Sequence, residues 1–212
     1  MGEGMTPAAK TEQAAPQSRP RVAGEREAQI LDATLDVLVE LGYDRLTMDA
    51  VATASKASKA TLYRRWSTKA DLVVDTLVRS KSAPGPLSPD TGNLRDDLIA
   101  ATCHKTGLND EMTMKLFAGL VSALHHDEEF SAAFHERFLQ PMVAATVALF
   151  ERARDRGEIA EHLDLDLFAT VLPSVALHRA FILGLPTDES MVERIVDEVV
   201  MPALRCASRG AH

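Results

Sequence analysis

Residues 46–72 read LTMDAVATASKASKATLYRRWSTKADL, and this stretch decides the fold of the first part of the chain. Thr47 can cap a short helix, because a threonine hydroxyl accepts a hydrogen bond from the free backbone N–H groups at a helix start. Residues 55–57 interrupt that helix, and another begins at Ser58. The pattern therefore predicts two short helices joined by a tight turn.

The second of these helices, residues 58–66, has two different faces. At about 100° per residue, Leu62 and Trp66 fall on one side, which predicts that both pack into a core. The other side carries small, hydroxyl-bearing and cationic residues, namely Ala60, Thr61 and Arg64. No acidic residue occurs between Asp49 and Asp71. Such a face suits a phosphate-lined groove, where arginine can also reach a guanine edge.

Charge is distributed unevenly around this stretch. The chain has a formal net charge of −8, yet residues 19–82 hold 11 Lys or Arg against 9 Asp or Glu. Residues 83–212 hold 11 against 20. The first region can lie against a polyanion, whereas the second would be repelled by one.

Composition predicts a soluble, cytoplasmic protein. Hydrophobic residues make up 46% of the 212 and charged residues 25%, which is ordinary globular usage. No apolar run approaches the roughly 20 residues that span a bilayer, and no secretory leader is evident. Cys103 and Cys206 are the only cysteines, too few for a disulfide framework.

The remaining pattern is helical throughout, so we expect an all-α protein. Apolar residues recur at helical spacing from Glu25 to Leu41, and Gly42 stands where helices commonly end. Thr68 can cap a further helix that runs to about Ser80. Pro141 lies inside a later helical stretch, where it kinks the helix or stands at a helix start, and the same holds for Pro173. The later helices are expected at 93–107, 110–126, 128–156, 164–184 and 188–206.

Breaks in the pattern divide the chain into regions. Residues 1–20 lack apolar periodicity and predict a disordered tail, and the prolines and glycines of 82–92 interrupt the helices. The expected regions are a tail over 1–20, a helix-turn-helix domain over 21–80, a linker or loop over 81–92, a second helical domain over 93–207 and a tail over 208–212.

The two short helices and their turn form a helix-turn-helix, and the segment from Thr47 to Leu72 resembles the DNA-binding segment of the tetracycline-repressor (TetR) family. The resemblance rests on the helix-opening Thr47, the Val51-Ala52 pair, the run from Ser58 to Tyr63, Trp66 and Lys69. It implies a DNA-binding head built on three helices, followed by a helical ligand-binding and dimerisation domain. It also implies a homodimeric repressor, not an enzyme, that binds a palindromic operator and is released by a small molecule.

Two positions depart from the family pattern. Lys56 stands in the turn, where the family usually has glycine, and Ala60 stands in the recognition helix, where the family often has glycine. A left-handed backbone at Lys56 costs on the order of 1 kcal/mol relative to glycine. Alanine favours the helix, so neither departure argues against the resemblance.

The resemblance also implies DNA contacts at matching positions. Tyr63 and Lys69 are expected on phosphates, and Lys59, Ala60, Thr61 and Arg64 nearer bases. The full expected set is Thr47, Lys56, Ser58, Lys59, Ala60, Thr61, Tyr63, Arg64 and Lys69.

Two further sets are expected in the second domain. The last two long helices are more apolar than one buried side requires, which predicts a dimer interface; its expected residues are Phe168, Val171, Leu172, Val175, Val192, Ile195, Val196 and Val199. Apolar and thioether groups there indicate a largely hydrophobic effector, and acidic surroundings favour a cationic one. The expected pocket residues are Cys103, Met114, Phe117, Leu120, Val147 and His178.

One alternative is a helical metal-dependent hydrolase with a DNA-binding head. It depends on the cluster from His125 to Glu129, whose imidazoles and carboxylates can bind metal. Neighbouring residues point in different directions on a helix, however, and a metal site would need further ligands at compatible helical spacing. The competing interpretation is a polar turn in which Asp127 caps the next helix. We expect no cofactor and no metal.

Overall fold

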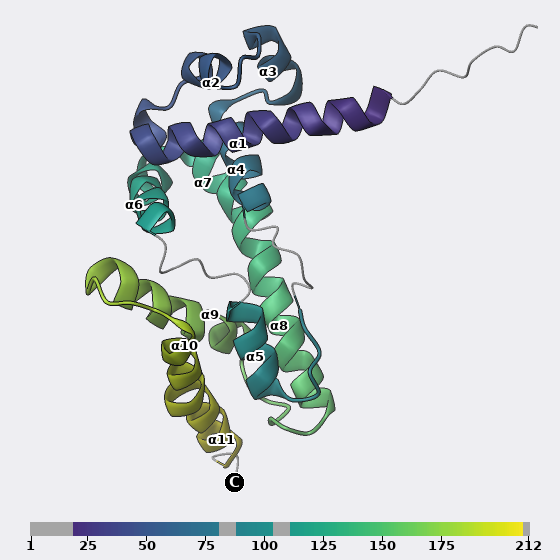
Figure 1. Ribbon diagram of the computed structural model, residues 1–212. Helices are drawn as coiled ribbons and strands as arrows, with labels where there is room; N and C mark the ends of the chain where they lie inside the picture. The colour runs from purple at the N-terminus through teal and green to yellow at the C-terminus, as the bar shows by residue number, and fades with distance from the viewer. Residues whose placement is uncertain (1–18, 81–87, 104–110, 210–212) are drawn as a thin grey trace, which may run out of the picture.

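The computed structural model describes residues 19–80, 88–103 and 111–209, and every regular element in these ranges is a helix (Figure 1). Most of the expected N-terminal tail, residues 81–87 of the expected linker and residues 210–212 lie outside the described ranges. The all-α prediction is confirmed.

Four helices form the head at one end of the molecule. α1 lies across this end, α2 and α3 lie on its outer side, and α4 leads toward the rest of the chain (Figure 1). Their bounds are Arg19–Arg45 for α1, Met48–Ala54 for α2, Lys59–Arg65 for α3 and Lys69–Ser80 for α4.

The predicted helix starts are confirmed. The Thr47 hydroxyl accepts a hydrogen bond from the Ala50 N–H at 3.1 Å, and the Ser58 hydroxyl accepts one from the Thr61 N–H at 3.1 Å. Thr68 likewise accepts from the N–H of Asp71 at 3.1 Å. These polar side chains therefore fix where the short helices begin.

Gly42 sharply bends the end of α1. Its backbone has φ 74° and ψ 168°, a combination that is essentially restricted to glycine. The chain resumes helical hydrogen bonding for a last turn that ends at Arg45. The helix predicted to stop at Gly42 thus continues past a kink, and the kink directs the chain toward α2.

The second half has three long helical stretches, each with a π-helical segment. The first is α7 (Glu128–Phe134), η1 (His135–Leu139) and α8 (Gln140–Asp155), and the second is α9 (Leu165–Leu177) and η2 (His178–Ile182). The third is α10 (Glu189–Ile195), η3 (Val196–Val200) and α11 (Met201–Arg209). They follow α5 (Leu94–Cys103) and α6 (Glu111–His126). The described helices agree with the predicted ones, and residues 104–107 and 110 of the predicted helices lie outside the described ranges.

Proline explains the position of one π segment. Pro141 is the second residue of α8 and lacks the N–H that would continue the α-helical ladder. Immediately before it, the N–H of Gln140 donates to the carbonyl of His135, five residues back. This π-helical hydrogen bond replaces the usual four-residue spacing next to the proline. Pro173, by contrast, lies inside α9.

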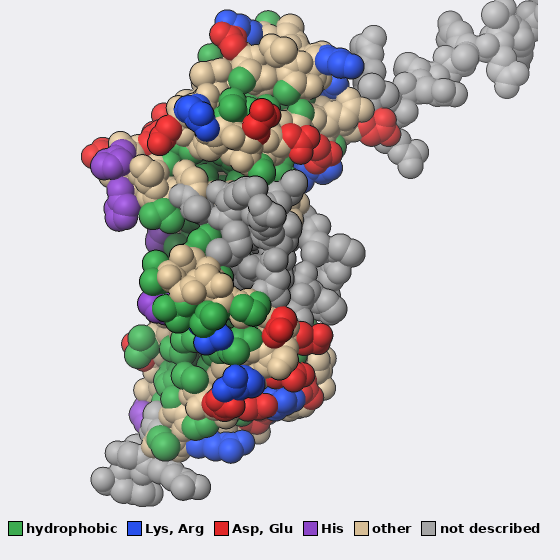
Figure 2. All heavy atoms as spheres, turned by 60° about the vertical axis from the view of Figure 1, so that its left-hand side comes forward, with side chains coloured by type: hydrophobic (Ala, Val, Ile, Leu, Met, Phe, Trp, Pro, Cys, Tyr) green, Lys and Arg blue, Asp and Glu red, His purple; other side chains and the backbone are tan. Residues whose placement is uncertain are grey.

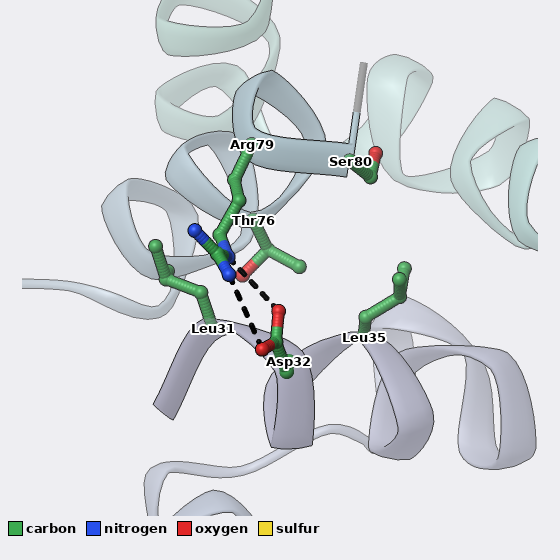
Figure 3. A pocket seen from close by; sticks show the side chains of 6 residues that line it. All are labelled: Leu31, Asp32, Leu35, Thr76, Arg79 and Ser80. Atoms are coloured by element: carbon green, nitrogen blue, oxygen red, sulfur yellow. Dashed lines mark hydrogen bonds and ion pairs between the residues drawn. The ribbon is translucent and has the colours of Figure 1, made fainter. Parts of the chain in front are cut away.

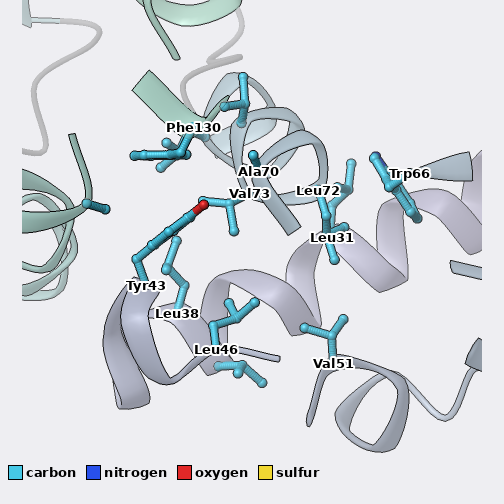
Figure 4. Close-up of a cluster of buried hydrophobic side chains, with 14 of the residues drawn as sticks. Leu31, Leu38, Tyr43, Leu46, Val51, Trp66, Ala70, Leu72, Val73 and Phe130 are labelled. Carbon is cyan, nitrogen blue, oxygen red and sulfur yellow. The ribbon is translucent and has the colours of Figure 1, made fainter. Parts of the chain in front are cut away.

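Two hydrophobic cores hold the chain together. The first joins α1, α2, α3 and α4 to residues of α6, α7 and η1, including Leu120 and Phe130 (Figure 4). The second joins α5, α8, α9, α10, η3 and α11. The core of the head thus extends beyond residue 80, and the expected division into domains stays a prediction.

Candidate DNA-binding surface

The recognition helix α3 is anchored by its apolar side. Leu62 is fully buried and Trp66 nearly so, as the helical wheel predicts. The Trp66 indole Nε1 donates a hydrogen bond to Asp75 Oδ2 at 2.7 Å, so its polar edge is also satisfied. These contacts orient the opposite side of α3 toward solvent.

The outward side of α3 presents aromatic, cationic and small groups. Tyr63 is 55% exposed, and Ala60 and Arg64 are exposed as well. Within the described residues, Arg64 has no hydrogen bond or ion pair, whereas Lys59 pairs with Asp49 of α2 at 2.5 Å. Arg64 is therefore a cation available to a base edge or a phosphate.

Three hydroxyl-bearing positions have local partners. Thr47 is exposed, and while its oxygen caps α2 its own proton remains available for a phosphate. The hydroxyls of Ser58 and Thr61 lie 2.9 Å apart and share a hydrogen bond. All three lie at helix starts, where backbone N–H groups also favour an anion.

The turn between α2 and α3 takes a left-handed conformation at Lys56. Its φ is 52°, and it is the non-glycine residue with positive φ in the described ranges. The side chain is exposed beside the recognition helix. Lys56 thus adopts the conformation for which the family uses glycine, and it adds a cation to this surface.

Lys69 is placed differently from the other expected DNA contacts. Its ammonium donates to the Tyr43 carbonyl at 3.2 Å and lies 3.9 Å from the centroid of the Tyr43 ring. The residue is half-buried. In this structure Lys69 joins α4 to the end of α1, which is a structural role that the sequence did not indicate.

Tyr43 also connects the head to the second half of the chain. Its hydroxyl donates to Asp127 Oδ2 at 2.7 Å, and its ring lies 4.3 Å from that of Phe130. Burial and this bond raise the pKa of Tyr43 far above 10. The N–H of Phe130, and then the Tyr43 hydroxyl, lower the pKa of Asp127.

Arg137 of η1 makes a second connection. It bonds to Asp71 at 3.0 Å and also to Asp75, the carboxylate that accepts from Trp66. A continuous polar chain therefore links the π segment η1, the helix α4 and the end of α3. Arg137 lies 62 and 66 residues from its two carboxylate partners in sequence, so no local pattern indicated these bonds.

The expected dimer residues fall into two groups. Four are core residues of the protomer and cannot form an interface: Leu172, Val192, Ile195 and Val196. Phe168, Val171 and Val175 are half-buried, and Val199 is 42% exposed. These four residues were wrongly expected at the interface because one apolar side of their helices packs against α5 and α8 of the same protomer.

A large apolar surface nevertheless remains on this part of the molecule. Residues 165–182 form an 18-residue helical stretch of mean hydropathy 1.4, of which only 28% is buried. Hydrophobic side chains also gather on the lower half of the face shown in Figure 2. The exposed large side chains here are Leu167, Ile182, Leu183, Leu185 and Val199.

The structure places only three of the six expected pocket residues. Leu120 belongs to the first core and Val147 packs on the second, whereas His178 is exposed. The side chains of Cys103, Met114 and Phe117 lie outside the described part of the structure. The grouping of these six residues into one effector site therefore stays a prediction.

A small pocket occurs between α1 and α4 (Figure 3). Its volume is about 220 Å³, below the roughly 300 Å³ at which ligand sites begin, and it is open to solvent. Arg79 crosses it to pair with Asp32 at 2.9 Å. The pocket offers no enclosed apolar site for an effector.

The histidine-rich turn forms no metal centre among the described residues. Asp127 Oδ1 accepts from the Phe130 N–H at 2.9 Å and so caps α7, as the competing interpretation predicted. His125 and His126 are exposed. No group of three or more His, Cys, Asp or Glu able to hold a metal occurs in the described ranges.

Comparisons with known proteins agree with this geometry. A family model of bacterial regulatory proteins of the tetR family matches residues 30–76, and one of the tetracyclin repressor-like C-terminal domain matches residues 88–199. The DNA-binding transcriptional repressor TetR of Mycobacteroides abscessus is 36% identical over 184 residues, which are 87% of this chain and 96% of that protein. The transcriptional regulator AqdR of Rhodococcus erythropolis is 31% identical over 173 residues, 80% and 81% of the two chains.

Solved structures show the same arrangement. The crystal structure of a TetR family transcription regulator has a TM-score of 0.64 and 26% identity, and the match covers 83% of this chain and 97% of that one. Both the head and the helical second half therefore have counterparts of known structure.

Proposed function

We propose that this chain, which belongs to the TetR family of bacterial transcription regulators, is a homodimeric repressor that binds a palindromic DNA site and is released by a small molecule. The observation that carries the proposal is the outward face of α3, where exposed Arg64 and Tyr63 stand opposite buried Leu62 and Trp66. Arg64 is proposed to read a base edge, and Tyr63 to contact a phosphate. The protein would act in the cytoplasm, where bacterial DNA lies.

The dimer is supported by the uncovered apolar side of α9 and η2. One head recognises one half-site, and a two-fold axis pairs two heads on a palindrome. Leu167 and Val199 are exposed on helices that also pack inside the protomer. A second copy that covers this surface removes it from water, which stabilises association by about 25 cal/mol per Å² of apolar area. We therefore assign the hydropathy of residues 165–182 to this interface and not to a membrane span.

Release by an effector is supported by the contacts between the two halves. Tyr43 to Asp127 and Arg137 to Asp71 connect the head to α7 and η1. A ligand that binds one arrangement of α6 and α7 about 100-fold better than the other can change the free-energy difference between the two conformations by up to roughly 2.7 kcal/mol. The effector is proposed to be largely apolar, and a cationic group would suit the acidic second half.

The experiment combines DNA binding with a ligand screen. The purified protein selects duplexes from a random pool, and small molecules that raise its melting temperature are then tested for release of the selected duplex. We expect apolar compounds among the molecules that do both. Stabilising compounds that never reduce DNA binding would contradict effector control, and a protein that selects no duplex would contradict the proposed function itself.

A further inference from the structure

Two adjacent residues of α1 hold the recognition helix at both of its ends. We propose that Arg26 and Glu27 are positioning residues that set the orientation of α3 on DNA, an inference that rests on the proposed function of α3. Arg26 holds the turn before the helix, and Glu27 holds Arg65 at the end of the helix. Neither is among the expected DNA contacts.

Arg26 bonds to the backbone of the turn. Its Nη2 donates to the carbonyls of Ser55 at 3.0 Å and Lys56 at 2.7 Å, while Nη1 donates to Gln29 Oε1 at 2.9 Å. The last carbonyls of a helix lack donors and carry partial negative charge, so a guanidinium at the end of α2 is well placed. Gln29 fixes the guanidinium from within α1.

This contact acts on the strained residue of the turn. Lys56 has φ 52°, a conformation that non-glycine residues disfavour, and its carbonyl is one of the two that Arg26 holds. Two residues later Ser58 caps the start of α3. A turn that relaxed toward negative φ at Lys56 would change the direction in which α3 leaves it.

Glu27 acts at the opposite end. Its Oε1 accepts from Arg65 Nη2 at 3.0 Å and its Oε2 from Arg65 Nε at 3.2 Å, a two-point pair that fixes direction as well as distance. The pair raises the pKa of Arg65, chiefly through the hydrogen bonds. It also directs Arg65 toward α1, whereas Arg64 next to it has no such partner among the described residues.

Positioning can be separated from direct phosphate contact by binding measurements. The probes are a duplex selected by the wild-type protein and a scrambled duplex of equal length, each titrated over a range of salt concentrations. For Arg26→Ala we expect about a tenfold loss on the selected duplex, the equivalent of one hydrogen bond. Binding to the scrambled duplex and the salt slope should stay unchanged, because no phosphate contact is removed.

The Lys56→Gly background supplies the decisive comparison. Glycine adopts the turn without help, so Arg26→Ala in that background should cost little of the affinity that the Lys56→Gly protein retains. If Arg26 bound phosphate instead, its loss would weaken both duplexes alike, reduce the salt slope by about one, and be the same in both backgrounds. That result would overturn the proposal. Melting curves of each variant identify any loss of affinity that comes from unfolding.

Glu27→Gln tests the other end without depending on Arg26. Loss of the two-point pair frees Arg65, so binding to the scrambled duplex should strengthen, the salt slope should rise by about one, and selectivity should fall. Glu25→Gln is the matched control, since Glu25 is exposed on the same helix and has no partner among the described residues. If the two variants change DNA binding equally, the loss of one negative charge explains the effect, and the proposed positioning role of Glu27 is overturned. A wild-type protein that selects no duplex would refute the proposed function instead.

Discussion

At the scale of single residues, the structure shows polar side chains that join parts of the chain far apart in sequence. Tyr43 is the clearest case. Its buried phenol donates a hydrogen bond to Asp127, its carbonyl accepts one from Lys69, and the Lys69 ammonium lies over its ring. A buried hydrogen bond to a charged group is worth about 1.5–3 kcal/mol. Tyr43 should therefore contribute to the stability of the fold and to the connection between its halves.

This role predicts a pH-dependent difference between the wild type and Tyr43→Phe. The pKa of Tyr43 is raised in the folded protein, so its contribution is fully present below about pH 10, the unfolded value, and is lost as pH rises through the folded pKa. At neutral pH the variant should lose about 1.5–3 kcal/mol of unfolding free energy in urea. The difference should shrink above about pH 10. A difference that is constant with pH would contradict the assignment.

Residue-level prediction from sequence succeeded for local interactions and failed for distant ones. The caps at Thr47, Ser58 and Asp127 follow from side chains that bond within three residues. Arg26 and Arg137 form hydrogen bonds to residues 29 to 66 positions away in sequence, and charge pattern alone does not select such partners. The contact of Lys69 was missed for the same reason, because its partner is a backbone carbonyl on another helix.

At the scale of elements, backbone conformation decides how the helices join. Gly42 is the sharpest example, since its φ and ψ lie in a region that other residues reach at a cost of about 1–3 kcal/mol. The kink lets α1 end close to α6, where an added Cβ on Gly119 would lie 3.6 Å from the Gly42 Cα.

Gly42→Ala should therefore destabilise the protein by about 1–3 kcal/mol in urea unfolding. A Cβ at this position meets no atom within 4 Å, so the loss comes from the backbone and not from a clash. Gly24→Ala is the matched control, because Gly24 is helical, exposed and equally unobstructed. It should stabilise the protein by up to about 1 kcal/mol. Equal effects of the two substitutions would argue against strain at Gly42.

The element that sequence described least well is the last helical stretch. Its apolar residues surround much of the helix, so periodicity predicted an interface without showing which side faces the protomer's own core. Val192, Ile195 and Val196 proved to be internal, whereas Val199 is exposed. The π segment η3 adds to this difficulty, because five-residue hydrogen-bond spacing shifts the faces of the helix.

At the scale of the whole molecule, we expect two chains to associate through α9, η2 and the last helical stretch. Leu167→Asp, at a position 60% exposed in the protomer, should produce a folded monomer by sedimentation. Val121→Asp is the matched control, since Val121 is similarly exposed on α6 and should leave the dimer intact. Val196→Asp should instead unfold the chain, because Val196 is fully buried. A Leu167→Asp protein that remains dimeric would place the interface elsewhere.

The central claim is that the outward face of α3 reads DNA sequence, and selection from a random DNA pool tests it most directly. The wild type should enrich an inverted repeat whose half-sites lie about one helical turn, 34–36 Å, apart or a multiple of it. Arg64→Ala should lose about 1–3 kcal/mol and lose preference at one base position in each half-site. The control is the Arg194→Ala variant, which lacks an exposed arginine of α10 and should enrich the same repeat as the wild type. An Arg64→Ala motif identical to that of the wild type at every position would contradict base reading by this face.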